Sequence, residues 1–466
     1  MPLDTKKIGF VAGIIAFLLA ILAVPVNNEI KSAIAVLLLC AIWWATEAIP
    51  IYATALLPAI LFPLMPVLPL QDAFGQYAHR VIFLFFAGFL IARAMIKWGL
   101  DKRIALFILA KGKDSRKLIL YFMLVTAFLS AFISNTATTA MMLPIGMAVL
   151  LHIKIKDKES YGKVLMLGIA YSATIGGVAT LIGTPPNAIF AGFAESLLGE
   201  KISFFDWLKI GLPFFAIMMP ITWLFLVEFY KPEKVKFKAE KFIGEEAKKL
   251  GRLKKEEMLV LFVFIFVVTL WITRPFWHLI GFSNLQNLLD DSIIALIGAV
   301  LLFIIPIDFK KWQSALALED IQEIPFGILT LFGGGLCLGK GLFESGAAQW
   351  LAEKVPTGNV LLLLLLVIII TSFLTEVASN TAIANMMLPI LIAIANNAEI
   401  NPYYLLIPAT LSCSLAFMFP ISTPPNAIVF SSGYIKMHDM IKAGVILHVI
   451  GLVIIFMLGQ FLFKLI

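Results

Sequence analysis

The sequence predicts an all-α polytopic membrane protein with inverted structural repeats, 11 transmembrane helices and two re-entrant helical hairpins. The chain of 466 residues is 61% hydrophobic and only 14% charged, which is unusual for a soluble domain. Apolar runs long enough to cross a hydrocarbon core of about 30 Å recur along the chain. Two short polar motifs each occur twice, in the same order in both halves.

The first apolar run follows Lys6 and Lys7 and could be mistaken for a secretory signal. Its length and the lack of a small-x-small cleavage site indicate a membrane anchor instead. The runs lack the strict polar and apolar alternation of a membrane β-barrel, so helices are expected. The predicted spans are residues 8–26, 30–48, 50–67, 81–97, 164–193, 208–229, 258–274, 292–306, 325–339, 403–432 and 443–465.

The basic residues predict the orientation of the chain. If residues 118–151 and 359–395 each enter and leave on the same side, 28 of the 36 Lys and Arg residues lie inside. This positive-inside bias predicts a plasma (inner) membrane protein with a cytoplasmic N-terminus and an external C-terminus. The net charge of +7 then reflects membrane topology, and no nucleic-acid partner is expected. Residues 231–257 are predicted to be a cytoplasmic linker, with a regulatory or lipid-binding role as the alternative.

A Ser-Asn-Thr triplet interrupts each of two apolar stretches. Residues 134–144 match residues 379–389 at 8 of 11 positions, and TPPNAI at 184–189 recurs at 423–428. An odd number of predicted spans separates the matching points, so the halves are expected to be inverted, as in many secondary transporters. A single triplet would indicate ordinary interhelical hydrogen bonding, whereas its duplication favours a functional site.

The first triplet lies midway along residues 118–151, which are long enough for two short helices but contain no charged turn. A re-entrant hairpin with Ser134, Asn135 and Thr136 at its tip is therefore expected. Hydroxyl groups, an amide and the free N–H groups of a helix start would meet there at the middle of the membrane. Irregular backbone at that depth survives only if it is buried or lines a wet cavity.

The second motif predicts a broken helix. Pro185 and Pro186 each lack a backbone donor, so the helix in 171–193 is expected to break around Gly183 and Thr184. A break exposes carbonyl oxygens, which suit Na+, and N–H groups, which suit a carboxylate. Two such sites without a basic residue predict a dicarboxylate anion held by neutral donors together with co-bound cations.

These paired triplets and Pro-Pro breaks, with WWATEAIPI at 43–51, make the chain resemble the divalent anion/sodium symporter (DASS) family of INDY-type dicarboxylate carriers over essentially its whole length. The resemblance implies a sodium-coupled secondary active transporter that imports C4 dicarboxylates such as succinate, malate and fumarate. It implies that the substrate contacts Ser134, Asn135, Thr136, Thr184, Ser379, Asn380, Thr381, Thr423 and Pro424. It also implies one sodium site made by Ser130, Ser134, Asn135 and Gly183, and a second made by Thr375, Ala378, Asn380 and Ser422, several through backbone carbonyls.

The resemblance further implies a homodimer in membrane lipid, with an elevator movement of a transport domain against a fixed scaffold. The expected parts are scaffold helices of the first repeat at 1–117, the first transport half at 118–230, the linker at 231–257, scaffold helices of the second repeat at 258–358 and the second transport half at 359–466.

Several alternatives remain open. A sodium-independent dicarboxylate exchanger, or a sulfate or citrate carrier, would share the triplets. Enzyme activity is not expected, because the spans contain neither Gly-x-Ser-x-Gly nor an Asp pair. A passive channel fits less well, since the hairpins are expected to enter from opposite sides. Cys40, Cys337 and Cys413 are predicted to be packing residues, and Glu376 either braces the second hairpin or tunes transport.

Overall fold

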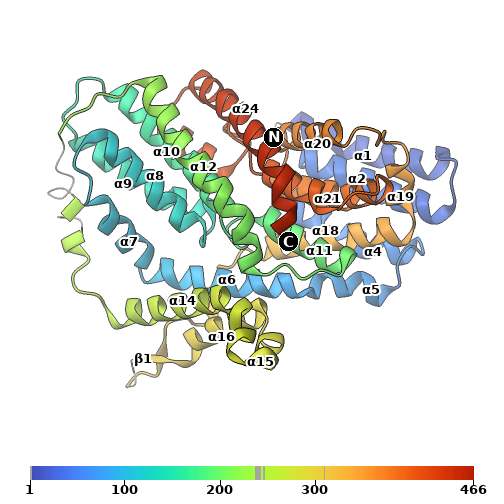
Figure 1. Ribbon diagram of the computed structural model, residues 1–466, viewed down its shortest axis with the longest axis horizontal. Helices are drawn as coiled ribbons and strands as arrows, with labels where there is room; N and C mark the ends of the chain where they lie inside the picture. The colour runs from blue at the N-terminus through green and yellow to red at the C-terminus, as the bar shows by residue number, and fades with distance from the viewer. Residues whose placement is uncertain (1–2, 237–242, 245–246, 309, 466) are drawn as a thin grey trace.

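The computed structural model describes residues 3–236, 243–244, 247–308 and 310–465, which are predominantly helical (Figure 1). Within these residues, 8 helices are long and apolar enough to cross a membrane. The prediction of an α-helical polytopic membrane protein is therefore confirmed. Three shorter apolar segments also coincide with predicted spans, namely Ile51–Leu64, Asp291–Ile304 and Tyr403–Ser412. One of the 8 long helices, Val360–Val377, belongs to a predicted hairpin.

The chain begins with a pair of helices, α1 (Leu3–Ala23) and α2 (Asn28–Thr46), that pack along each other. Asn27 starts α2 as an N-cap, with its side chain accepting from the N–H of Ile30 at 2.8 Å. The indole of Trp43 donates to the carbonyl of Phe10 at 3.2 Å and links the two helices. This hydrogen bond satisfies the indole N–H of Trp43 in a pair of helices that is expected to face lipid.

The predicted span at 50–67 coincides with the apolar segment Ile51–Leu64, but it is not one continuous helix. The structure divides it into α3 (Ile51–Thr54) and α4 (Leu57–Leu64). Pro58 lies at the start of α4 and has no N–H to offer to the preceding turn, so α3 cannot continue into it. Helices α5 (Leu70–Gly75), α6 (Arg80–Lys97) and α7 (Leu100–Leu109) follow.

Each predicted hairpin consists of two helices joined by a short tip. The first comprises α8 (Ser115–Ser130) and α9 (Asn135–His152), and the second comprises α20 (Val360–Val377) and α21 (Asn380–Asn397). In both, the Asn of the triplet is the first helical residue after the tip. The position of the tips was therefore predicted correctly, while the depth of the tips in the membrane stays a prediction.

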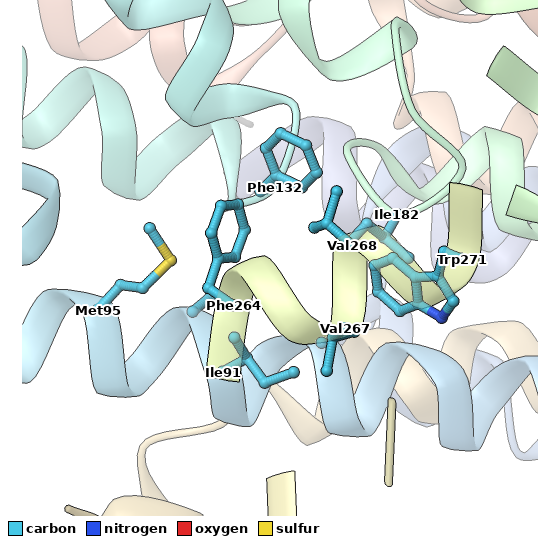
Figure 2. A pocket seen from close by; sticks show the side chains of 10 residues that line it. Ile91, Met95, Phe132, Ile182, Phe264, Val267, Val268 and Trp271 are labelled. Carbon is cyan, nitrogen blue, oxygen red and sulfur yellow. The ribbon is translucent and has the colours of Figure 1, made fainter. Parts of the chain in front are cut away.

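The first tip packs against an apolar surface made by α6 and α14 (Lys255–Thr273). Figure 2 shows Phe132 of the tip beside Phe264 of α14, with their ring centroids 5.0 Å apart and the rings nearly perpendicular at 87°. Ile91, Val268 and Trp271 line the same small pocket. This contact surface consists of aliphatic and aromatic side chains.

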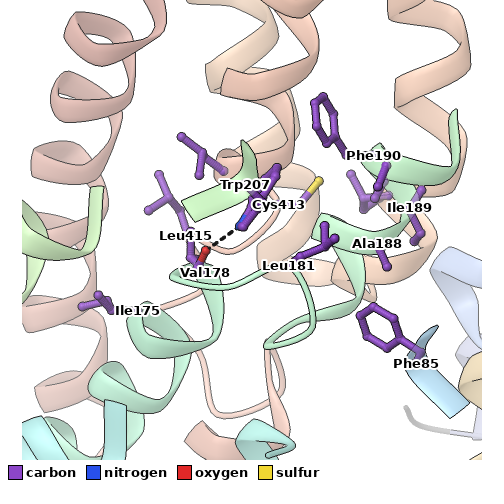
Figure 3. Packing of buried hydrophobic residues seen from close by; sticks show 14 of the residues in the cluster. Phe85, Ile175, Val178, Leu181, Ala188, Ile189, Phe190, Trp207, Cys413 and Leu415 are labelled. Atoms are coloured by element: carbon purple, nitrogen blue, oxygen red, sulfur yellow. Dashed lines mark hydrogen bonds between the residues drawn. The ribbon is translucent and has the colours of Figure 1, made fainter. Parts of the chain in front are cut away.

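Both predicted broken helices are broken. The first comprises α10 (Lys158–Val178) and α11 (Pro185–Leu198), and the second comprises α22 (Tyr403–Ser412) and α23 (Pro424–Phe430). The first break begins at Ala179, ahead of the expected Gly183, because side chains capture the carbonyls that would continue the helix. The indole of Trp207 donates to the carbonyl of Val178 at 2.9 Å (Figure 3). The Pro pair therefore starts α11, and capture of the carbonyls ends α10.

The remaining elements complete the helical assembly. They are α12 (Phe204–Tyr230), α15 (Ser283–Leu288), α16 (Asp291–Ile304), α17 (Leu318–Gln322), α18 (Phe326–Glu344), α19 (Ala347–Ala352) and α24 (Met437–Leu462). Short 3₁₀ turns at Gln76–Ala78, Arg274–Ile280 and Phe463–Leu465 connect or end helices. A two-stranded antiparallel pair, β1 (Pro306–Asp308) with β2 (Gln313–Ser314), was not predicted.

The predicted linker at 231–257 is only partly described, since 237–242 and 245–246 lie outside the described residues. Its first part runs along the start of α8, where the Ser115 hydroxyl donates to the carbonyl of Glu233 at 2.7 Å. Its last part contacts α7, where Arg103 binds both carboxylate oxygens of Glu257 at 2.9 Å. The two ends of the linker are thus held by two different elements.

Helix α10 is the most enclosed long helix near the site. It packs against α8, α9, α12 and α23, and its residues from Val164 to Val178 are all buried. Close approach requires glycine at one point, because a Cβ on Gly176 would fall 2.7 Å from the carbonyl carbon of Ala127 in α8. The first hairpin is therefore held tightly against the first broken helix.

Candidate functional site

The first hairpin and the first broken helix bring three oxygen atoms together. The hydroxyl oxygen of Ser130 lies 2.6 Å from Oδ1 of Asn135 and 2.7 Å from the carbonyl oxygen of Ala173. A hydroxyl carries one hydrogen and can donate to only one of these two oxygens. Whichever of the two oxygens accepts this hydrogen, the other lies at hydrogen-bond distance from the Ser130 hydroxyl oxygen with no hydrogen between them. A small cation that prefers oxygen ligands fits such a cluster.

The second half repeats this arrangement with different residues. The hydroxyl oxygen of Thr375 lies 2.6 Å from Oδ1 of Asn380 and 2.7 Å from the carbonyl oxygen of Cys413. Thr375 is buried, so water does not compete freely for these oxygens. Each half therefore has one hydroxyl, one amide oxygen and one main-chain carbonyl in the same relation.

The helices that follow the two tips present unused polar groups. Ser134 and Ser379 are the N-caps of α9 and α21, and neither makes a side-chain capping bond. The first turn of a helix carries N–H groups without intrahelical partners and a partial positive charge. A carboxylate could accept from these groups without any basic side chain.

Two asparagines after the Pro pairs hold the broken helices open. The Nδ2 group of Asn187 donates to the carbonyls of Gly177 and Thr180, at 3.2 and 2.7 Å. In the other half, Nδ2 of Asn426 donates to the carbonyls of Ala416 and Phe419, at 3.1 and 3.0 Å. Both asparagine side chains are buried. These bonds satisfy carbonyls that a broken helix would otherwise leave unpaired.

The two halves contact each other through these segments. Helix α23, which follows the second Pro pair, packs against α9 and α10 of the first half. Helix α11, which follows the first Pro pair, packs against α21 of the second half. The structure thus brings the two hairpins and the two broken helices into one connected set of contacts.

The expected substrate-contacting residues differ in exposure. Ser134, Asn135, Ser379, Asn380 and Thr381 are partly exposed, Thr136 and Pro424 are exposed, and Thr184 and Thr423 are buried. Partial exposure at both tips is compatible with access for a ligand. Thr184 and Thr423 are the N-caps of α11 and α23, so they mark the ends of the two breaks.

The expected sodium-binding residues are also located. Ser130 and Asn135 share the first oxygen cluster, and Thr375 and Asn380 share the second. Gly183 lies against the first tip, because a Cβ placed there would be 3.0 Å from the carbonyl oxygen of Ala131. The remaining expected ligands, Ser134, Ala378 and Ser422, lie in or beside the tips, and the hydroxyl of Ser422 is bonded to Glu376.

Sequence reasoning missed two groups in these clusters, the main-chain carbonyls of Ala173 and Cys413. A carbonyl is present at every residue, so no sequence signal could single out these two. Cys413 was predicted to be a packing residue, and its thiol is indeed free and buried. Its carbonyl, however, belongs to the second cluster. Thr180 was also missed, although its hydroxyl donates to the carbonyl of Ala131 and ties the first break to the first tip.

The groups in the two clusters that could bind a cation are neutral oxygen ligands. Among the described residues, no group of three or more His, Cys, Asp or Glu side chains is placed to hold a metal ion. Hydroxyl, amide and carbonyl oxygens suit a hard monovalent cation better than a transition metal. The arrangement is therefore suited to small cations, and it lies beside the uncapped N-termini of α9 and α21.

Comparison with known proteins agrees with this geometry. The model of the family described as "Sodium:sulfate symporter transmembrane region" matches residues 5–466. The chain is 38% identical over 475 residues to the "Sodium-dependent dicarboxylate transporter SdcS" of Staphylococcus saprophyticus, covering 98% of this chain and 91% of the relative. It is 39% identical over 480 residues to the protein of the same name in Staphylococcus aureus, covering 99% and 92%.

A solved structure supports the fold. The crystal structure of the Alcanivorax borkumensis YdaH transporter aligns with a TM-score of 0.60 over 93% of this chain and 98% of that chain. The two sequences are only 13% identical, so this likeness concerns the fold alone.

Proposed function

We propose that this chain, which belongs to the sodium:sulfate symporter family of integral membrane transporters, imports C4 dicarboxylates such as succinate, malate and fumarate with sodium as the co-transported ion. The observation that carries the proposal is the pair of matching oxygen clusters at Ser130 and Thr375. Each cluster contains three oxygen atoms but only one hydroxyl hydrogen to bond between them. The oxygen that receives no hydrogen bond is free to bind a cation. The names of the Staphylococcus relatives support both sodium and a dicarboxylate.

Sodium and substrate would reinforce each other. A dianion brought close to two neutral tips carries a high desolvation cost, and a cation bound at each tip lowers it. Sodium binding would also order Asn135 and Asn380, whose helices supply the N–H groups for the two carboxylates. By thermodynamic linkage, bound substrate then raises the affinity for sodium by the same factor.

We further propose the division into a scaffold (1–117 and 258–358) and a transport part (118–230 and 359–466), joined by the linker at 231–257. The apolar contact of Phe132 with Phe264 supports a movement of the transport part along α6 and α14 (Figure 2). Aliphatic and aromatic surfaces can slide without breaking hydrogen bonds. Ion pairs also cross this boundary: Nε of Arg80 in α6 lies 2.5 Å from the carboxylate of Glu195 in α11, and a guanidinium nitrogen of Arg116 lies 3.9 Å from the carboxylate of Glu228 in α12.

The orientation and assembly belong to the same proposal. The inside placement of 28 of 36 basic residues supports a cytoplasmic N-terminus and an external C-terminus. The homodimer rests on the resemblance to the family. Cross-linking of the protein in intact membranes would test it.

The test is radiolabelled succinate uptake into proteoliposomes that contain the purified protein. With an inward sodium gradient we expect saturable accumulation that malate and fumarate inhibit and that disappears when choline replaces sodium. Succinate counterflow of equal size without sodium would show an exchanger instead. Uptake of sulfate or citrate in preference to succinate would contradict the proposed substrate.

A further inference from the structure

Glu376 is a buried carboxylate that the proposed transport cycle does not yet use. It lies in α20, directly after Thr375 of the second oxygen cluster, and its side chain is 2% exposed. Ionisable side chains inside a membrane domain are costly unless they are paired and hydrogen-bonded. Its contacts therefore indicate what it is retained for.

The carboxylate holds the backbone of the second break. It accepts from the N–H of Phe417 at 2.9 Å, from the N–H of Met418 at 3.1 Å, and from the hydroxyl of Ser422 at 2.6 Å. These donors lie in residues 413–423, the segment between α22 and α23. Glu376, which was expected either to brace its own hairpin or to tune transport, thus binds to the segment between the two parts of the second broken helix.

An imidazole completes the arrangement from a third element. Nδ1 of His448 in α24 lies 3.3 Å from Oε1 of Glu376 and 3.0 Å from the carbonyl oxygen of Leu415. Nε2 of the same ring lies 3.2 Å from the hydroxyl oxygen of Ser372. His448 is itself buried. The pair therefore ties α20, α24 and the segment 413–423 together at one point.

The first half has no counterpart of the Glu376–His448 pair, and the length of the first break explains why. The corresponding residue of the first hairpin is Ala131, and the first break spans only residues 179–184. The hydroxyl of Thr180 bonding to the carbonyl of Ala131 is enough to fix that short segment. The second break is longer, at 413–423, and more backbone must be ordered for Cys413 to point its carbonyl at Thr375.

We propose that Glu376, supported by His448, is the positioning residue of the second sodium site. It fixes residues 413–423 so that the carbonyl of Cys413 faces the hydroxyl of Thr375, which in turn contacts Oδ1 of Asn380. This inference rests on the proposed sodium-coupled function. It makes the second site more dependent on a single side chain than the first site is.

The experiment compares Glu376→Gln with Glu353→Gln, a control of the same chemistry at an exposed residue. The glutamine keeps the size of the side chain but replaces one acceptor oxygen with a donor that faces the N–H of Met418 or the hydroxyl of Ser422. We expect the half-saturating sodium concentration for succinate uptake to rise by about tenfold or more, with a lower Hill coefficient. The succinate KM at saturating sodium should stay within about twofold.

A second readout separates sodium binding from transport. The thermal stabilisation of the purified protein by NaCl over choline chloride should need about tenfold more sodium in Glu376→Gln than in the wild type. His448→Gln should shift both readouts in the same direction, which decides the case if Glu376→Gln does not fold. Sodium dependence within about twofold of the wild type in a folded variant would overturn the inference.

Failure of the proposed function gives a different result. A wild-type protein that is stabilised by sodium but transports succinate without it would contradict the coupling, while the thermal readout would still decide the role of Glu376. A wild-type protein that shows no stabilisation by sodium would overturn both.

Discussion

Asn135 and Asn380 occupy equivalent positions in the two halves, and each places its side-chain oxygen 2.6 Å from the hydroxyl five residues before it. Each residue also begins the helix that follows its tip. One side chain therefore contributes an oxygen to an oxygen cluster while its backbone starts a helix whose first N–H groups have no intrahelical partner. In the proposed function, this double placement would couple cation binding to anion binding.

Replacing either asparagine with alanine should abolish sodium-driven uptake without unfolding the protein. Loss of one amide oxygen from a cluster is expected to weaken sodium binding roughly 10- to 100-fold. Proteoliposome uptake with a sodium titration measures this loss, and Asn396→Ala on the exposed face of α21 is the matched control. Wild-type uptake by Asn135→Ala or Asn380→Ala would contradict the assignment of the clusters.

The buried asparagines after the Pro pairs should matter for stability. Asn187→Ala leaves the carbonyls of Gly177 and Thr180 without their side-chain donor, and Asn426→Ala does the same for Ala416 and Phe419. We expect each variant to lose about 2–4 kcal/mol of unfolding free energy. Thermal melting in detergent should rank both well below Asn284→Ala, a change at an exposed residue. Melting temperatures equal to that control would show that the breaks do not depend on these amides.

Close helix contact makes Gly176 intolerant of a side chain. Gly176→Ala would press a methyl group against the backbone of Ala127, which has no rotamer to change. We expect a destabilisation of about 1–3 kcal/mol, measured by thermal unfolding. Gly88→Ala is the matched change in α6, because its Cβ would meet only a side-chain methyl of Ile182 at 3.8 Å. Equal stability of the two variants would contradict the packing of α8 on α10.

Asp101 in α7, outside the membrane-spanning helices, predicts a pH dependence of stability. Burial raises the pKa of its carboxyl group from 3.8 to about 6, and a bond from the N–H of Lys102 offsets only part of this effect. Between these values the folded chain holds a proton that the unfolded chain has lost, so stability falls as the pH rises. The expected loss from pH 5 to pH 8 is about 1 kcal/mol.

Asp101→Asn should remove that contribution, since asparagine stays neutral and keeps an oxygen for the N–H of Lys102. Thermal unfolding at pH 5 and pH 8 measures the difference, with Glu319→Gln as an exposed control. An unchanged pH profile in Asp101→Asn would show that other groups produce the dependence.

The repeated motifs allowed the hairpins and broken helices to be predicted, because a triplet or a Pro pair restricts the backbone wherever it occurs. The tips at Ser134 and Ser379 follow directly from that constraint. The residue at which the first break begins could not be predicted from the motif. It depends on Trp207 and Asn187, whose side chains reach the end of α10 only after folding. Tertiary contacts of this kind leave no local pattern.

The same distinction applies to the site. Hydroxyl and amide ligands such as Ser130 and Asn380 could be predicted from their residue types. The carbonyls of Ala173 and Cys413 could not, since a main-chain oxygen has no residue identity. Glu376 was noticed as an unusual buried charge, but its partners lie in a segment distant in the sequence, at Phe417 and Ser422.

The crossing of α11 onto α21 and of α23 onto α9 means that neither half is self-sufficient. In a polypeptide that contained one half alone, the short helix after the Pro pair would lack the helix of the other half against which it packs. The oxygen cluster of that half would then be open to water. Two such pieces would have to associate, with each short helix packing against the hairpin of the other piece, before either could retain an ion. Fusion into a single chain removes that assembly step and makes the encounter of the two pieces independent of concentration.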